Sequence, residues 1–232
     1  MIFFTADTHF GHDNIIEYCK RPYRTIAEMD TGLMQLWRDT VGDDDDVYLL
    51  GDFTVLDIKS MIAYASELTG QLHIVPGSHD ARWLVPWMNR VTWLDEYTQA
   101  TSVKGVRSAS GHHVLVYPPL VSMNKELYKY LLEPDQVPPT IVLCHYGMRT
   151  WDRSIYNSWQ LFGHSHGALP PLGMSMDVGV DCWKYRPITI LQAAEKMQEL
   201  RLQRNKLSRS KVAKNTLPPL EEPAQQEYLQ IR

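Results

Sequence analysis

The sequence contains no long hydrophobic run and few cysteines. None of its apolar stretches approaches the roughly 18 to 20 residues of a membrane-spanning helix. The first residues lack a basic segment, and Asp7 interrupts the opening apolar run, so no secretory signal is expected. The three cysteines, Cys19, Cys144 and Cys182, fit neither a disulfide framework nor a zinc motif and are expected to be reduced thiols. Together these features predict a soluble, cytoplasmic protein with no membrane partner.

The sequence also lacks a large excess of positive charge. Its formal net charge is −4, so general electrostatic attraction to nucleic acid is not favoured. A glycine-rich phosphate-binding loop of the Walker type is absent as well. One late stretch is basic, with Arg201, Arg204, Lys206, Arg209, Lys211 and Lys214. We interpret it as a solvated helix end, and a nucleic-acid-binding arm is the alternative.

The chain is long enough for one sizeable core. It has 232 residues, of which 44% are hydrophobic, and this predicts a single domain over residues 1–207. From residue 208 onward the apolar periodicity is lost, and serine, proline, glutamine and charged residues become frequent. Residues 208–232 are therefore predicted to be a flexible tail.

Strand and helix patterns alternate along the first part of the chain, which is typical of an α/β protein. Short apolar runs predict strands at residues 2–6, 47–50, 72–75, 140–144, 159–162, 176–180 and 188–191. Helical spacing predicts helices at residues 26–39, 56–68, 124–132 and 193–207. Alternation over residues 97–118, interrupted by turn signals, predicts a hairpin or meander.

Five short motifs rich in aspartate and histidine follow one another along the chain. They are Asp7-Thr8-His9, Gly51-Asp52, Gly77-Ser78-His79-Asp80, the single His145, and Gly163-His164-Ser165-His166. Each motif lies where a predicted strand ends, and ligands of open α/β sheets gather beyond the carboxyl ends of strands. A lone aspartate or histidine more often caps a helix or forms a hydrogen bond in the core. The ordered set instead favours a site for two divalent metal ions, with residues left over for catalysis.

The pattern D-x-H, G-D, G-N-H-D, H, G-H-x-H resembles that of the calcineurin-like metallophosphoesterase superfamily over residues 1–191. The stretches TADTHFGHDNII, CHYGMRTWDRS, GHSHG and MDVGVD are similar to those of its small bacterial and phage phosphoesterases. The resemblance implies a four-layer αββα sandwich, in which two mixed sheets are flanked by helices. It also implies a dinuclear metal centre at one end of the sandwich.

The resemblance assigns the metal ligands by position. The first ion would take Asp7, His9 and His166, Asp52 would bridge both ions, and the second ion would take Ser78, His145 and His164. Manganese is the expected metal, with iron, zinc, nickel and magnesium as alternatives. Ser78 departs from the pattern, because the family has asparagine there and a hydroxyl is a shorter and poorer ligand than an amide oxygen. The affinity of the second site is therefore in question.

The implied activity is hydrolysis of a small phosphate ester, such as a nucleotide or cyclic nucleotide, by a hydroxide that bridges the two ions. His79 would face the substrate phosphate as an acid catalyst, and Asp80 would hold its ring. Two alternatives stay open. The chain could be a nuclease or phosphodiesterase acting on polynucleotide, or a non-catalytic binding protein with a weakened second metal site. The oligomeric state is not predicted.

Further residues near the motifs are candidates for contacts with substrate. They are His12, Asn14, Arg82, Arg149 and Trp151. His12 and Asn14 could line the pocket or start a helix. The arginines suit phosphate recognition, and Trp151 could stack on a base. Solvent-facing arginines and a packed tryptophan are the alternative.

Overall fold

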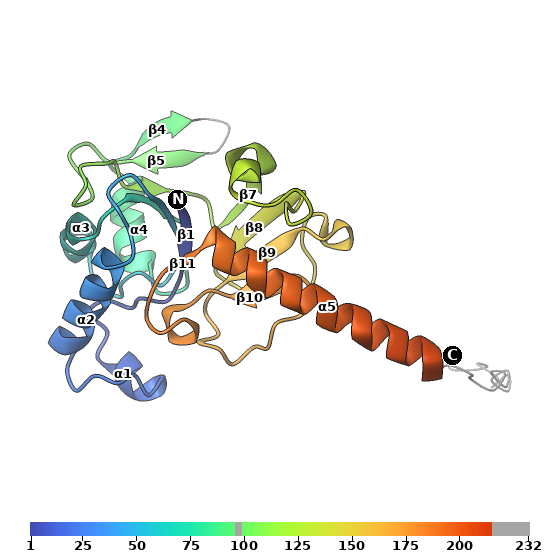
Figure 1. Ribbon diagram of the computed structural model, residues 1–232. Helices are drawn as coiled ribbons and strands as arrows, with labels where there is room; N and C mark the ends of the chain where they lie inside the picture. Colours follow the sequence, from blue (N-terminus) through green and yellow to red (C-terminus); the bar gives the residue numbers. More distant parts are fainter. Residues whose placement is uncertain (96–98, 215–232) are drawn as a thin grey trace, which may run out of the picture.

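The computed structural model describes residues 1–95 and 99–214, and it shows two mixed β-sheets with helices (Figure 1). The larger sheet has seven strands in the order β11-β1-β2-β3-β6-β5-β4. These are β1 (Ile2–Thr5), β2 (Asp46–Leu49), β3 (Gln71–Ile74), β4 (Thr92–Asp95), β5 (Ala100–Ser102), β6 (Leu115–Val116) and β11 (Ile188–Thr189). The strands from β1 to β6 along this order are parallel, and antiparallel strands flank them on both sides.

The smaller sheet has four strands in the order β10-β9-β8-β7. These are β7 (Leu120–Asn124), β8 (Thr140–Cys144), β9 (Trp159–Phe162) and β10 (Ser175–Asp177). The α-helices are α1 (Asn14–Tyr18), α2 (Ile26–Arg38), α3 (Ile58–Glu67), α4 (Ala81–Met88) and α5 (Ile190–Lys214). Four short 3-10 turns complete the described elements, at Lys125–Leu127, Lys129–Leu131, Ser154–Tyr156 and Val180–Cys182.

Both faces of the larger sheet are buried, because successive side chains of a strand point to opposite faces. In β1, Phe3 packs into a core with residues of α2, α3 and α4, whereas Phe4 belongs to a second core. That second core contains residues of both sheets, such as Leu143 of β8, together with the start of α5. The two sheets therefore pack against each other, and three helices cover the outer face of the larger one.

The strand ends of the two sheets are joined by backbone contacts. An isolated parallel bridge pairs Ala6 with Gly179. Nearby, the Asp7 N–H donates to the Gly51 carbonyl at 3.0 Å, and the Gly163 N–H donates to the His145 carbonyl at 3.0 Å. The His164 N–H donates to Asp7 Oδ2 at 2.9 Å and so links the loops of the two sheets. The loops after β1, β2, β8 and β9 thus meet at one place.

Most of the predicted elements are confirmed, with small shifts of their ends. The strands at residues 140–144 and 159–162 have the predicted bounds. Within residues 97–118 the expected antiparallel pair is present as β5 and β6, whereas β4 lies before this range and was not predicted. The helix expected at 124–132 is wrong, because that segment forms two 3-10 turns, the first of them capped by the Asn124 side chain. Helix α4 was not predicted, since Pro86 lies inside it and reads as a helix breaker.

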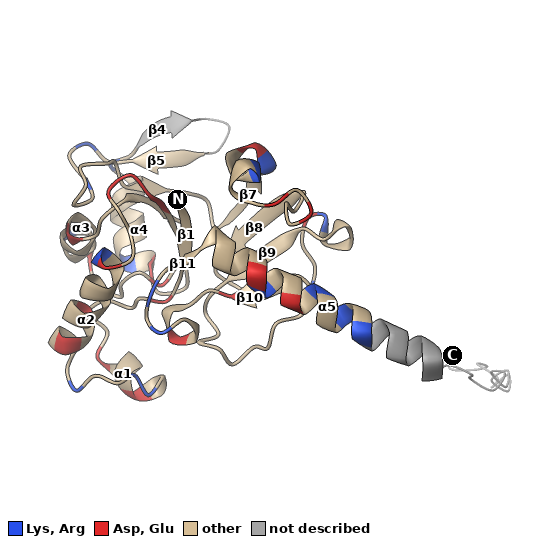
Figure 2. Cartoon of the chain, viewed as in Figure 1, with Lys and Arg blue, Asp and Glu red and all other residues tan. Residues whose placement is uncertain are grey.

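The expected start of the tail at residue 208 is also wrong, because α5 continues to Lys214. Residues 208–214 include one alanine, one arginine and two lysines, which favour helix even without a packed face. Residues 215–232 of the expected tail lie outside the described part of the chain. Figure 2 shows the charges along α5, and Arg204 on its outer part donates to the Asn157 side chain at 2.7 Å. None of the described helices is both long and apolar enough to cross a membrane.

Candidate metal centre

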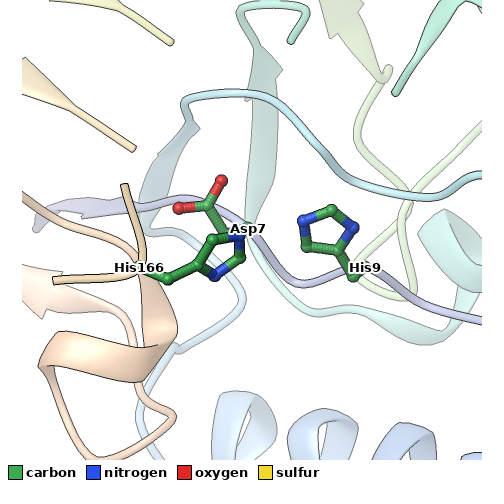
Figure 3. A group of neighbouring side chains, drawn as sticks. All are labelled: Asp7, His9 and His166. Carbon is green, nitrogen blue, oxygen red and sulfur yellow. The ribbon is translucent and has the colours of Figure 1, made fainter. Parts of the chain in front are cut away.

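The loops after four strands bring the expected ligand side chains into two groups. One group is Asp7, His9 and His166 (Figure 3), and the other is Asp52, His145 and His164. Within each group, one ligand atom per residue lies within 4.8 Å of the others. This grouping matches the two sets expected from the sequence, and each group could hold a metal ion.

Asp52 lies between the two groups. Its Oδ2 is 3.5 Å from Nε2 of His9 and 3.3 Å from Nε2 of His145, so one oxygen faces a histidine of each group. Ser78 lies beside it, and the Ser78 Oγ is 3.1 Å from Asp52 Oδ2 and 3.5 Å from His145 Nε2. The serine hydroxyl is therefore at the second group, where it donates to the shared carboxylate.

His9 presents a buried ring nitrogen with no hydrogen-bond partner in the structure. The residue is 1% exposed, and its Nε2 accepts and donates no hydrogen bond. Leaving a buried polar atom unsatisfied costs roughly 1–3 kcal/mol. A lone pair on such a nitrogen, next to two carboxylates, fits a divalent cation.

A buried ion pair orients His166. The Arg21 guanidinium donates from Nε and Nη2 to Asp181 at 2.9 and 2.8 Å, and Asp181 Oδ2 lies 2.7 Å from Nδ1 of His166. The same guanidinium donates to the carbonyls of Asp7 and Thr8 at 2.7 and 2.9 Å. Arg21 thus holds both loops of the first group. By donating through Nδ1, His166 keeps Nε2 free for a ligand role.

A third group, Cys19, His166 and Asp181, also has its ligand atoms close together. It shares His166 with the first group, and its carboxylate is already paired with the Arg21 cation. We therefore treat it as the outer layer of the first group.

The backbone at the site is strained. Five of the expected ligand residues have positive φ angles, namely Asp7 (59°), His9 (52°), Asp52 (53°), His164 (64°) and His166 (47°). Such conformations are costly for residues other than glycine and are concentrated at functional sites. Close packing adds to the constraint, because a Cβ on Gly77 would lie 2.5 Å from Asp52 Oδ1.

Burial sets the charge of the first group. It raises the pKa of Asp7 to about 7, although the charge of the neighbouring His166 acts to lower that pKa. It lowers the pKa of His9 to about 2 despite the nearby Asp52 carboxylate, so His9 is neutral and able to act as a ligand at neutral pH. Burial alone would raise the pKa of Asp52, but hydrogen bonds from His145 and the His79 backbone outweigh it and lower that pKa.

The role expected for Asp80 is wrong. Its buried carboxylate accepts the backbone N–H groups of Asp52, Phe53 and Gly77 at 2.9, 3.0 and 2.7 Å, and the Trp83 indole N–H at 2.8 Å. These bonds tie the loop after β2 to the loop after β3, and none of them goes to the His79 ring. The His79 side chain is 49% exposed, and its Nε2 lies 4.0 Å from Asp52 Oδ2.

The two groups open into a cleft with a volume of about 630 Å³. His79, His12 and Asn14 line it, and Asn14 also begins α1. Trp151 does not line it, because this side chain packs against the core between the sheets and donates from its indole to the Ser158 carbonyl at 3.1 Å. Arg82 on α4 and Arg149 are exposed and likewise lie outside the cleft lining, so their contact with substrate stays a prediction.

Four functional candidates were missed from the sequence: Tyr18, Lys20, Arg21 and Asp181. Tyr18 and Lys20 line the cleft from the end of α1, whereas Arg21 and Asp181 form the ion pair behind it. Arg21 and Asp181 are 160 residues apart, and a pairing over that distance has no local signal. The stretch MDVGVD, which contains Asp181, was the one available hint.

Comparisons with known proteins place the chain beside others of unassigned role. No family model matches it. An uncharacterized protein of Methanocaldococcus jannaschii is 40% identical over 81 residues, which are 34% of this chain and 46% of that protein. The gene 66 protein of Mycobacterium phage L5 is 32% identical over 80 residues, which are 33% of this chain and 38% of that protein. The matched region thus spans less than half the length of these relatives.

A solved structure shares the fold. It is that of a protein of unknown function, AQ665, from Aquifex aeolicus, with a TM-score of 0.52 and 19% sequence identity. The match covers 84% of this chain and 98% of that one. Fold and side-chain geometry together define a mixed α/β protein with a buried cluster of potential metal ligands.

Proposed function

We propose that this chain is a metal-dependent phosphoesterase with the calcineurin-like four-layer αββα sandwich, acting on a small phosphate ester such as a nucleotide. One observation carries the proposal. Two groups of aspartate and histidine side chains meet at Asp52, and one of their buried nitrogens, Nε2 of His9, lacks a hydrogen-bond partner. Two adjacent cation sites opening into one cleft are the arrangement of two-metal phosphoryl chemistry.

The residues present suit two divalent ions. Asp7, His9 and His166 would hold one ion, His145 and His164 would hold the other with Ser78 beside them, and Asp52 would contact both. Imidazole and carboxylate ligands suit manganese, our first candidate, and also iron and zinc. When bound, such ions activate water and offset the negative charge of a phosphate group.

The chain's own residues would position and protonate the substrate. His79 lies half-exposed on the cleft, and its backbone N–H donates to Asp52 Oδ1 at 2.8 Å, which fixes where its ring emerges. The ring is then placed to donate a proton to the oxygen that leaves phosphorus. Asp80 supports this by holding the loops that carry Asp52 and Gly77.

Metal analysis together with turnover tests the proposal. Protein loaded with Mn²⁺ is expected to retain two ions per chain and to hydrolyse p-nitrophenyl phosphate or bis-p-nitrophenyl phosphate. The variant Asp52→Asn should lose most of both properties, because a neutral amide is a poor bridge between cations. Asp44→Asn, at an exposed turn, is the matched control. Metal-free protein without turnover would refute the proposal, and cleavage of a labelled oligonucleotide would identify a nuclease instead.

A further inference from the structure

The cleft is larger than a phosphate group requires. Its volume of about 630 Å³ lies in the range of pockets that enclose a whole small molecule. Asp52 and five histidines, among them His9 and His166, line part of it. A second part of the wall is formed by α1 and the two residues that follow it, including Ile15, Tyr18 and Lys20, and the lining also includes Ser165 and Ala168. This second wall is available to the organic part of an ester.

Tyr18 gives that wall an aromatic face. Its side chain lines the cleft and is 71% exposed. An aromatic ring exposed in this way buries little apolar surface and so adds little to the stability of the fold. Ile15, one turn earlier on α1, is buried and anchors the helix in the core next to α2. The ring is therefore presented to the cleft from a fixed backbone, and stacking on a flat aromatic group is what such a ring does best.

Lys20 gives the same wall its charge. Among the described residues that line the cleft, it is the one lysine or arginine. The acidic neighbours on this segment, Asp13 and Glu17, are exposed but do not line the cleft. Lys20 has a φ of 51° and lies two residues after the end of α1, where its backbone N–H donates to the Glu17 carbonyl at 3.2 Å.

We propose that Tyr18 and Lys20 form a subsite for a planar aromatic group joined to a phosphate, as in a nucleotide. Tyr18 stacks on the aromatic ring, and Lys20 attracts the charge of the phosphate. The proposal rests on the proposed function and corrects the expectation that Trp151 would be the stacking residue.

Two probes that differ only in the base test this subsite: adenosine 5′-monophosphate and ribose 5-phosphate. Both are titrated into the Mn²⁺-loaded protein by calorimetry, and released phosphate is measured in the same samples. Where phosphate is released the comparison uses kcat/KM, and otherwise it uses Kd. Wild type should prefer the nucleotide by about tenfold, the scale of one base stacking on an aromatic side chain.

Substitution of the two side chains should affect binding of the probes in different ways. Tyr18→Ala should lose the preference for the nucleotide and leave ribose 5-phosphate unchanged, whereas Tyr18→Phe should keep it. Lys20→Gln should weaken both probes alike by about threefold, because it acts on charge. Tyr130→Ala, at a tyrosine that is 72% exposed, and Lys184→Gln, at an exposed lysine with a φ of 54°, are the matched controls and should behave as wild type.

Equal affinity of wild type for the two probes, or equal effects of Tyr18→Ala and Tyr130→Ala, would overturn the subsite. If Lys20→Gln bound both probes as Lys184→Gln does, Lys20 would not be part of the subsite. A preserved nucleotide preference in a protein that hydrolyses neither p-nitrophenyl phosphate nor bis-p-nitrophenyl phosphate would refute the proposed function and leave the subsite standing.

Discussion

Asp7 carries a carboxylate that is hard to ionise in the metal-free chain. Burial raises its pKa from the ordinary 3.8 to about 7. The folded chain therefore holds a proton that the unfolded chain has already released, and between about pH 4 and pH 7 this group's stabilising effect is lost as the pH rises.

The isosteric variant Asp7→Asn removes this penalty. In chelator, at pH 8, it should be more stable than wild type by on the order of 2–4 kcal/mol, and the difference should vanish below pH 4. Urea unfolding across this pH range measures it. A difference that does not vary with pH would contradict the assigned cause.

The ion pair between Arg21 and Asp181 should act on one metal group alone. Asp181→Asn weakens the hydrogen bond to Nδ1 of His166 and leaves Arg21 a buried cation without its partner. Mn²⁺ titration should show a loss of about 10- to 100-fold in affinity at one site and none at the other. Equal loss at both sites would indicate a general structural defect. Asp44→Asn serves again as the control.

Ser78 can be replaced by asparagine, the residue that the resemblance implies at this position. Its hydroxyl lies at the second group but donates to Asp52, so it contributes little as a ligand. Ser78→Asn should bind the second Mn²⁺ more tightly and lower the concentration needed for half-occupancy. Unchanged binding in titrations would mean that the site is adapted to serine.

At this scale the sequence predicted the ligands better than their supports. His145 and Asp52 follow apolar runs, and such a position is visible in the chain itself. The partners of Asp80 are backbone N–H groups of other loops, which carry no sequence signature. Trp151 was ambiguous for the same reason, because its packing depends on which sheet lies beneath it.

Helix α2 shows how an element supports the site from a distance. Thr25 caps its first turn by accepting the Glu28 N–H at 3.2 Å, and the Glu28 carboxylate accepts the Arg24 N–H at 2.9 Å. Its buried face includes Met29, whose sulfur lies 3.5 Å from the Arg21 guanidinium. The helix therefore backs the ion pair that orients the first metal group.

Thr25→Ala should lower the free energy of unfolding by about 1 kcal/mol, while Thr25→Ser should retain the cap. Chemical denaturation measures the change. Metal stoichiometry should stay at the wild-type value in both variants. A loss of metal in Thr25→Ala alone would show that the helix end controls the site more directly.

Elements with a regular pattern of apolar residues could be predicted from the sequence. Elements whose conformation depends on packing against the rest of the fold could not. The apolar run at β8 can be buried in only one way, whereas α4 carries Pro86 and has just two turns. Its buried tryptophans, Trp83 and Trp87, reveal a helical face only once the sheet beneath is known. The end of α5 was misjudged because composition alone does not show where a solvated helix stops.

Across the whole molecule, the candidate metal centre joins the two sheets. Asp7 and Asp52 follow strands of the larger sheet, and His145 and His166 follow strands of the smaller one. A bound cation would therefore link layers that otherwise meet through the shared apolar core.

Mn²⁺ at about 100 times its Kd should stabilise the fold by about 2.7 kcal/mol. For a chain of this size that corresponds to a rise in Tm of roughly 5–10 °C over chelated protein. Thermal unfolding in Mn²⁺ and in EDTA measures the shift. Asp52→Asn should show a much smaller rise, and an equal rise would place the stabilising ion elsewhere.

The ring of contacts around Arg21 has a consequence for how such a protein diverges. Residues 10–20 leave the centre after His9 and return at Arg21, whose guanidinium donates to the carbonyls of Asp7 and Thr8. The two ends of this segment therefore lie close to each other. His12 contacts His9 through their Nδ1 atoms at 3.2 Å, so the part after it, residues 13–20, is the part that can be exchanged or lengthened without removing this contact. Under the proposed function, selection can change the preferred ester through this segment while the candidate ligands stay the same, and a designer can graft a new segment between the same two ends.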